Sequence, residues 1–432
     1  MLRTVLAACI ISCVLVQDSS SEWRTDGLVM PKSHSARFFE IHPDGSGGAL
    51  VAYDDNPTAL AQRIDSLGAL QWSVENPLIT RKLNINSVDI SSVPDGSQGL
   101  IVLARRSDGD LRAQRIDASG TLLWGADGIA IATAPAAGFY DVKSVSDGAG
   151  GAYLTWLDSR AVAGGYYATH LLASGTIASG WAPSGNAIAS NSSPPFMRAD
   201  GSGGIYLVWT RRIVSPRTEI RVLRMTSSGG VALPWPADGL IITPSDSTSH
   251  ATDMALVGSD VVMTWTAIRP LGPGTHYSNG ICAQRVSSNG TLMWGANGRA
   301  VRPNVESSIH DGSRVVPSGD GAVIVWSERP DLNSLGNVAI VAQRLDASGS
   351  AIWGTVGRRI VDPGYYQYSV SVVPDSAAGV FIVWIVGLFQ GGAVMTQHLD
   401  ESGIRLWDPH GIQVSRTSGT DYVGTGVTWS CL

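Results

Sequence analysis

One short phrase recurs seven times along the chain, and this repetition limits the possible folds more than any other feature of the sequence. It reads AQRIDSLGALQW in its first copy, AQRIDASGTLLW in its second and AQRLDASGSAIW in its sixth. Every copy ends in a tryptophan, and the seven are Trp72, Trp124, Trp181, Trp235, Trp294, Trp353 and Trp407. Their average spacing is roughly 56 residues, which is in the range of solenoid and propeller arrays.

A glycine-rich turn that runs into an apolar segment precedes each copy of the phrase. Examples are PDGSGGALVAY, SDGAGGAYLTW and PSGDGAVIVW. Asp-Gly turns beside alternating apolar residues, such as Ala152, Leu154 and Trp156, are strong hairpin signals. Each unit therefore predicts four strands: a short polar strand, the apolar run, the AQR segment and a strand that starts at the tryptophan.

Seven four-stranded antiparallel units without helical patterns predict an all-β fold, a β-propeller of seven blades. An array of β-sandwiches fits less well, because each sandwich needs about 100 residues. The segment around Trp23 (EWRTDGLVMPKS) matches a fourth strand, and DYVGTGVTWSCL resembles a first strand. The alternative is therefore eight blades with the last one truncated, although we favour seven in a single domain over residues 22–432.

The repeated residues receive structural roles. The tryptophan of each phrase is expected to fill the gap between neighbouring blades, and the Asp-x-Ser-Gly before it makes a hairpin. The tryptophans of the apolar strands are expected in the core; they are Trp156, Trp209, Trp265, Trp326 and Trp384. The arginine of the phrase is expected to be a structural partner, at Arg63, Arg115, Arg224, Arg285 and Arg344.

The first 21 residues read as an export signal. Arg3 precedes an apolar run from Val5 to Val16, and a serine-rich stretch follows. The run is shorter than the about 20 residues that span a bilayer, so no transmembrane span is expected. Cys9 and Cys13 loosely resemble a lipoprotein cleavage site, which leaves open a lipoprotein or an ordinary signal. The expected location is secreted or cell surface.

Composition excludes several partners. The formal net charge of −6 is spread without runs, so neither nucleic acid nor an anionic membrane is expected as a partner. The eight histidines are scattered, and outside the signal only Cys282 and Cys431 remain, which predicts no metal site and no disulfide framework. The Asp-Gly turns are explained as hairpins rather than as calcium ligands. We expect no cofactor and a monomer.

Several units combine an apolar strand that ends in Trp, a nearby Asp or Arg (LTWLDSR, LVWTRR, VWSERP), and then a phrase such as AQRLDASG followed by Trp. This combination resembles a propeller-like repeat of secreted bacterial proteins of unknown function. LDASGSAIW is also similar to the tryptophan-docking repeat of quinoprotein propellers, with one residue less between Asp and Gly. That motif is structural and implies no quinone. SSNGTLMW has a weaker likeness to the Asp-box of sialidases, without its central Asp.

Variable loops indicate where a site would lie. The connections from strand two to three, and from strand four to the next unit, differ in length and chemistry, while the other turns are short and uniform. Binding residues tend to lie on variable loops of a rigid scaffold. The candidates on that face are Arg160, Tyr166, Arg211, Arg269, His276, Tyr277, Glu328, Arg329, Tyr365 and Tyr366. The alternative is that each is an ordinary solvated residue.

The expected function is a secreted or cell-surface scaffold that binds a protein or a carbohydrate, because no catalytic motif is evident. The alternative is a glycoside-active enzyme of the sialidase kind, which needs an arginine cluster with an acid and a nucleophile. The arginines Arg160, Arg211, Arg269 and Arg329, with Glu328 as the acid, are the residues for that alternative. A quinone-dependent dehydrogenase is a third and weaker hypothesis.

Overall fold

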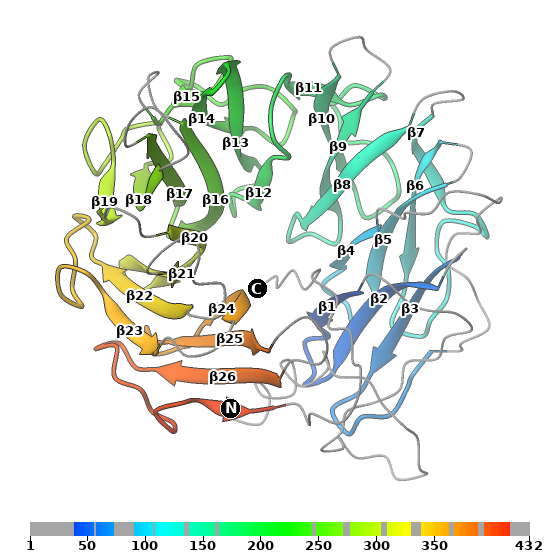
Figure 1. Cartoon of the computed structure of the whole chain (residues 1–432). Coiled ribbons are helices and arrows are strands. Elements are labelled where there is room, and N and C mark those ends of the chain that lie inside the picture. The colour runs from blue at the N-terminus through cyan, green and yellow to red at the C-terminus, as the bar shows by residue number, and fades with distance from the viewer. Residues whose placement is uncertain are drawn as a thin grey trace.

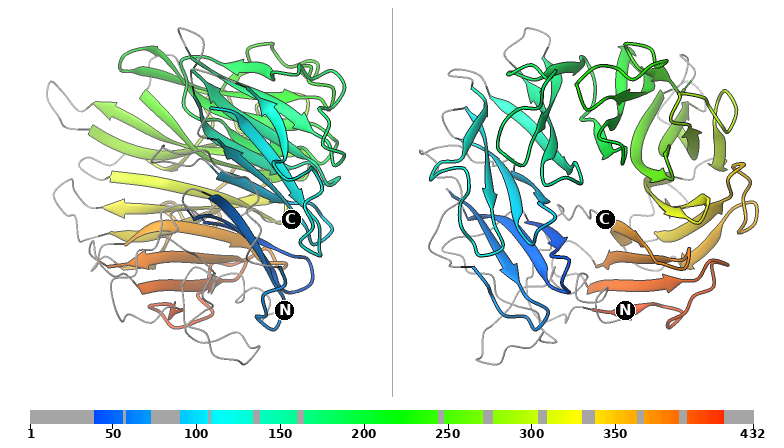
Figure 2. Two further views of the ribbon diagram at one scale, coloured as in Figure 1. Left: turned by 90° about the vertical axis from the view of Figure 1, so that its right-hand side faces the viewer. Right: turned by 180° about the vertical axis from the view of Figure 1, so that it is seen from behind.

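The computed structural model is a ring of seven antiparallel sheets around a common axis (Figure 1). It describes residues 39–55, 58–72, 90–106, 109–133, 138–159, 164–243, 248–270, 277–303, 309–329, 338–362, 367–387 and 393–414. Residues 1–21, for which an export signal is expected, Trp23 and residues 415–432 lie outside the described residues. Figure 2 shows the ring edge-on and from behind.

The strands follow one another around the ring in chain order. Blade 1 has β1 (Phe39–Pro43), β2 (Ala49–Asp55) and β3 (Thr58–Ile64); blade 2 has β4 (Ile90–Pro94), β5 (Leu100–Arg105), β6 (Leu111–Ile116) and β7 (Ile129–Ala132). Blade 3 has β8 (Phe139–Ser146), β9 (Ala152–Asp158), β10 (Gly165–Leu171) and β11 (Asn186–Ala189). Blade 4 has β12 (Phe196–Ala199), β13 (Ile205–Val214), β14 (Arg217–Met225) and β15 (Leu240–Ile241).

Blades 5 to 7 continue the same order. Blade 5 has β16 (Thr248–Val257), β17 (Asp260–Pro270), β18 (Tyr277–Val286) and β19 (Arg299–Arg302). Blade 6 has β20 (Ile309–Ser318), β21 (Gly321–Arg329), β22 (Ala339–Leu345) and β23 (Arg358–Val361). Blade 7 has β24 (Gln367–Pro374), β25 (Val380–Val386), β26 (Ala393–Leu399) and β27 (Ile412–Gln413).

The prediction of a seven-bladed propeller is confirmed. Each sheet is a meander, and its first strand lies nearest the axis (Figure 1). Six sheets have four strands, and blade 1 has three within the described residues. Those residues form no eighth sheet and contain no helix long and apolar enough to cross a membrane.

The second strand of each blade is buried on both faces, because each sheet packs against a neighbour on either side. All six residues of β5 are buried, as are the first six of β13 and of β21. The tryptophans of the second strands are almost fully buried, as expected; they are Trp156, Trp209, Trp265, Trp326 and Trp384. Truncating a buried aromatic side chain of this size to alanine typically lowers the free energy of unfolding by about 3 to 5 kcal/mol.

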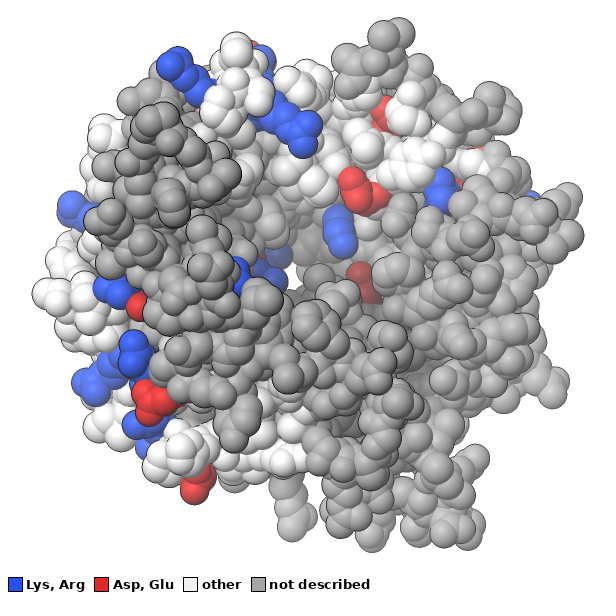
Figure 3. All heavy atoms as spheres, viewed as in Figure 1, with Lys and Arg blue, Asp and Glu red and all other residues white. Residues whose placement is uncertain are grey.

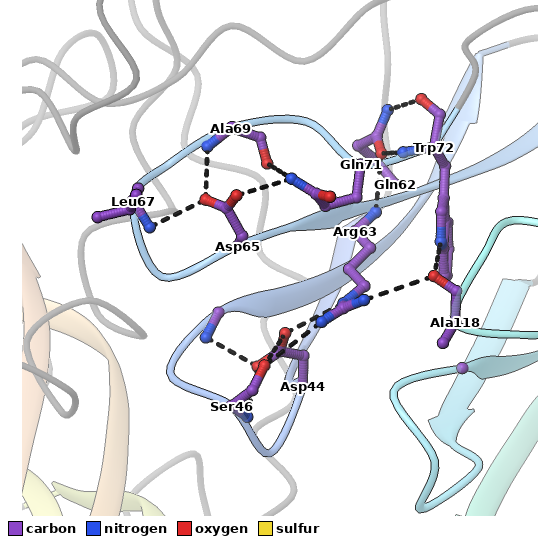
Figure 4. A network of polar contacts seen from close by, with 12 residues as sticks. Asp44, Ser46, Gln62, Arg63, Asp65, Leu67, Ala69, Gln71, Trp72 and Ala118 are labelled. Atoms are coloured by element: carbon purple, nitrogen blue, oxygen red, sulfur yellow. Dashed lines mark hydrogen bonds and ion pairs between the residues drawn. The ribbon is translucent and has the colours of Figure 1, made fainter.

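The recurring phrase forms a clamp between blades, shown for blade 1 in Figure 4. Arg63 donates to Asp44 in the first turn of its own blade (Nε to Oδ2, 3.1 Å). The same guanidinium and the indole of Trp72 both donate to the carbonyl of Ala118 in blade 2 (3.4 and 3.1 Å). The arginine and tryptophan of blade 4 share the carbonyl of Ser288 in blade 5 in the same way.

The glutamine of the phrase fixes the tryptophan within its own blade. Gln284 is fully buried; its Oε1 accepts from the backbone N–H of Trp294 (2.9 Å), and its Nε2 donates to the carbonyl of Gly295 (2.6 Å). The aspartate of the phrase closes the hairpin, since Asp346 Oδ1 accepts from the N–H groups of Ser348 and Ser350. The glutamine, arginine, aspartate and tryptophan of the phrase therefore each have a structural role.

The fourth strand begins later than the sequence pattern predicts. β7 starts five residues after Trp124, and the intervening segment is a turn. A glycine in this turn packs directly on the second strand: a Cβ added to Gly298 (φ +71°) would lie 2.5 Å from the carbonyl oxygen of Ala283 and 2.7 Å from the indole of Trp265. The turn therefore lets the tryptophan leave the sheet and reach the next blade.

Two blades replace the arginine of the clamp with histidine. His170 bonds Asp147 (2.9 Å) in blade 3, and His398 bonds Asp375 (2.7 Å) in blade 7. Each imidazole stacks on an aromatic ring of its second strand, with centroids 4.2 Å from Tyr153 and 4.0 Å from Phe381. The hydrogen bond to the aspartate is kept, but the imidazole is too short to donate to a carbonyl of the next blade as the arginine does.

We expect Trp294→Ala to lower the free energy of unfolding by about 3 to 5 kcal/mol, because it removes a fully buried wedge and its hydrogen bond to Ala347 (3.0 Å). The matched control is Met293→Ala, since Met293 is adjacent and half exposed; it should cost less than about 1 kcal/mol. Chemical denaturation measures both, and equal losses would show that the tryptophan is not the wedge.

Candidate functional site

The connections that enclose the candidate site all lie at one end of the propeller, called the loop face below. This end carries the β9–β10, β11–β12 and β13–β14 connections, because an antiparallel meander returns every second connection to the same end. Between blades 3 and 4 they enclose a pocket of about 190 Å³. Its lining residues are Leu157, Gly164, Gly165, Tyr166, Asn191, Ser192 and Arg212.

Tyr166 forms the blade 3 wall of this pocket. Its side chain is 3% exposed, and its hydroxyl donates to Asp141 Oδ2 on β8 (2.7 Å). Across the sheet, Tyr166 pairs with Leu157 on β9, and Leu157 pairs in turn with Tyr140 on β8. The exposed ring of Tyr140, over which the guanidinium of Arg105 lies at 4.7 Å, thus ends the same row of side chains.

The blade 4 wall is a short loop locked to the β13 strand. The N–H of Arg212 donates to the carbonyl of Asn191 (2.9 Å), and Asn191 Nδ2 donates to the carbonyl of Arg212 (3.0 Å). Ser192, the next residue, pairs with Arg211, and its Oγ is buried and has no hydrogen-bond partner in the part of the chain that the structure describes. A buried hydroxyl without a partner costs free energy, which a ligand that bonds to it would recover.

Two non-glycine residues with a positive φ lie at this pocket or support it. Among the described residues, four non-glycine residues have a positive φ: Gln98, Asp141, Asn191 and Ala378. Gln98 and Ala378 belong to the glycine-rich turns that recur in every blade, whereas Asn191 (φ 52°) lines the pocket and Asp141 (φ 51°) holds Tyr166. Strained residues persist where the surroundings impose them, and they cluster at functional sites.

The sequence-derived candidates fall into three groups. Tyr166 lines the pocket, and Arg211 precedes Arg212 on β13. Glu328 and Arg329 end β21, and the backbones of Arg269 and Tyr277 lie on β17 and β18. The side chains of Arg269 and Tyr277 are not described, and four candidates lie outside the described residues altogether: Arg160, His276, Tyr365 and Tyr366.

Arg211 and Glu328 belong to separate ion-pair clusters in the described structure. Arg211 lies 3.5 Å from Glu219, which also accepts from Arg221 Nε at 2.6 Å in the same blade. Glu328 instead binds Arg302, a residue of β19 in blade 5, through both carboxylate oxygens (3.1 and 2.8 Å). This pair links blade 5 to blade 6, and Arg302 was not among the sequence-derived candidates.

Glu328 remains ionised over most of the pH range. Burial acts to raise the pKa of its carboxyl, but His310 and Arg302 outweigh it and lower the pKa to about 2. The Nε2 of His310 lies 3.5 Å from Glu328 Oε2, and its Nδ1 contacts the carbonyl of Asn279. A carboxylate held this firmly is a structural anion, and it cannot donate a proton at neutral pH.

Charged residues also lie on the first strands, which surround the axis. Glu40 of β1 bonds Ser92 of the next blade, and burial raises the pKa of its carboxyl against the lowering effects of Ser92 and Lys143. Asp253 of β16 likewise accepts from the N–H of Val315 in blade 6 (3.0 Å) and pairs with Arg198. Figure 3 shows acidic and basic side chains around the central hollow, so neither sign of charge dominates there.

The described residues contain no group of three or more His, Cys, Asp or Glu side chains placed to hold a metal ion. The pocket between blades 3 and 4 offers a ligand the polar side chains of Tyr166, Asn191, Ser192 and Arg212. Of its lining residues, the candidates derived from the sequence include only Tyr166. The loop sequences contained Gly164, Gly165 and Arg212, but nothing in the sequence pattern marked Asn191, Ser192 or the supporting Asp141.

Comparison with known proteins identifies the fold and no family. No family model matches the chain, and no curated protein matches it. The crystal structure of polysaccharide lyase Uly1 is similar over 91% of this chain and 95% of its own, with a TM-score of 0.50 and 9% identity. BP39L lectin from Burkholderia pseudomallei is similar over 87% and 94%, with a TM-score of 0.44 and 11% identity. At 9% identity the similarity to Uly1 shows a common fold alone.

We expect Glu328→Gln to reduce stability most at neutral pH. A pKa lowered from 4.5 to about 2 means that the folded state gains stability above pH 4.5 and loses it as the pH falls towards 2. The gain is on the order of 3 kcal/mol. Melting temperatures of the native chain and the variant should therefore converge between pH 6 and pH 2.5.

The control for this experiment is Glu401→Gln, because Glu401 is exposed and only its backbone carbonyl takes part in the clamp. Its melting curve should follow that of the native chain at every pH. A Glu328→Gln curve that runs parallel to the native one would contradict the assigned pKa.

Proposed function

We propose that this chain is a non-enzymatic β-propeller scaffold that binds a glycan through its loop face, with the pocket between blades 3 and 4 at the centre of the site. The observation that carries this proposal is the pocket itself, with the unpartnered Oγ of Ser192 and the strained Asn191 at its wall. We also propose that the chain is secreted or displayed at the cell surface, because residues 1–21 resemble an export signal.

The size and chemistry of the pocket favour a sugar over a protein partner. Its volume of about 190 Å³ is below the roughly 300 to 1,000 Å³ of pockets for drug-sized ligands, and it matches a single small polar unit. Hydroxyl, amide and guanidinium groups lie around it beside an aromatic wall. This is the mixture that a ligand rich in hydroxyl groups and with apolar C–H faces requires.

The enzymatic alternative assigned the acid role to Glu328. With a pKa of about 2 and both oxygens on Arg302, Glu328 does not fit the proton donor that glycoside hydrolysis needs. Binding without turnover is therefore the better-supported proposal.

A glycan array and a protein array, probed with the purified chain, test this proposal. We expect selective binding to glycans and no release of reducing ends when the bound glycans are incubated with the chain. Tyr166→Phe should weaken binding by about 5- to 10-fold, because it removes the hydrogen bond to Asp141 that holds this pocket-lining residue in place.

The matched control is Tyr167→Phe, which removes a hydroxyl from the next residue, on the opposite face of β10 and stacked towards Trp156. It should leave affinity within about twofold of the native value, a change of less than 0.5 kcal/mol. Binding to proteins alone, or catalytic release of sugar, would overturn the proposal.

A further inference from the structure

The charge of the pocket lining narrows the class of sugar. Among the lining residues that the structure describes, Arg212 is the one charged side chain, and none of them is a carboxylate. Building on the proposed glycan-binding function, we propose that this pocket recognises an acidic sugar, with the carboxylate or sulfate group of the sugar on Arg212.

Arg212 differs from its neighbour on β13 in having its charge available. The side chain of Arg211 lies 3.5 Å from Glu219. Arg212 is exposed, and within the described residues its guanidinium forms no hydrogen bond or ion pair. Alternate residues of a strand face opposite sides, so Arg212 points away from the Glu219 cluster. A planar guanidinium with free donors suits bidentate binding of an oxyanion.

The backbone around Arg212 is already ordered for this role. The two hydrogen bonds between Arg212 and Asn191 fix the strand against the loop, and Ser192 is paired with Arg211. Binding therefore requires ordering of one side chain rather than of a loop, which reduces its entropic cost.

Asn191, on the same wall as Arg212, supplies an acceptor, which distinguishes an acidic sugar from a simple anion. Asn191 uses its Nδ2 on the Arg212 carbonyl, which leaves its Oδ1 to accept. This acceptor suits a sugar hydroxyl, whereas a sulfate ion or a glutamate side chain has no hydroxyl to offer it.

The test measures the affinity of the purified chain for four probes by isothermal titration calorimetry. They are an oligogalacturonate (carboxylate), a sulfated galactan oligosaccharide, a neutral galactan oligosaccharide and a polyglutamate peptide. We expect at least one of the two acidic sugars to bind about 10-fold or more tightly than the neutral one. The comparison of the first two shows which oxyanion is preferred.

Two variants place the effect at the pocket. Arg212→Gln should weaken acidic-sugar binding by about 10- to 100-fold and change neutral-sugar binding little. Arg217→Gln is the matched control, because it removes the same charge from the same hairpin at an exposed position outside the pocket lining. It should leave the affinity within about twofold.

The outcomes separate this inference from the proposed function. Binding of neutral sugar with equal affinity, unchanged binding in Arg212→Gln, or equal losses in both variants would overturn the acidic-sugar assignment alone. Binding of polyglutamate in preference to every sugar would replace the glycan with an acidic protein segment. Absence of binding to all glycans on the array would overturn the proposed function itself.

Discussion

The shared carbonyl at the blade boundary is the interaction on which the rest of the propeller depends. At Ala118, Ser288 and Glu401, an arginine and a tryptophan of one blade donate to a single backbone oxygen of the next. The indole fills the space between the sheets, and the guanidiniums of Arg63 and Arg224 join the first turn of their own blade to the third turn of its neighbour. Because each clamp uses the same few residue types, the chain repeats the phrase that encodes it.

This clamp leaves the opposite end of the propeller free to vary. The turns that take part in the clamp lie at one end, where their sequences are nearly uniform, and the loops at the other end need satisfy only their own geometry. Blades 3 and 4 use this freedom to build a pocket from a bulged first strand, a Gly-Gly entry into β10 and a loop locked to β13. Blades 5 and 6 use it for an ion pair between Arg302 and Glu328.

The repeated phrase made the fold predictable from the sequence. The residues of the candidate site do not recur from blade to blade, so most of them were difficult to predict. Arg63 and its equivalents could be assigned a structural role because they recur, and Tyr166 could be selected because its loop does not. Asp141 and Arg302 could not be found, since their partners lie 25 and 26 residues away and depend on a local bulge or on a neighbouring blade. The late start of the fourth strand was missed because it depends on close packing of Gly298 against Trp265.

The central claim is that a ring of blades joined by recurring clamps presents a ligand pocket between blades 3 and 4. A crystal structure of the chain with the glycan that binds it most tightly tests this claim directly. The account predicts an ordered sugar between Tyr166 and Ser192, with the blade boundaries unchanged. An ordered sugar beside Glu328, or among the charged first strands at the axis, with solvent alone between Tyr166 and Ser192, would contradict it.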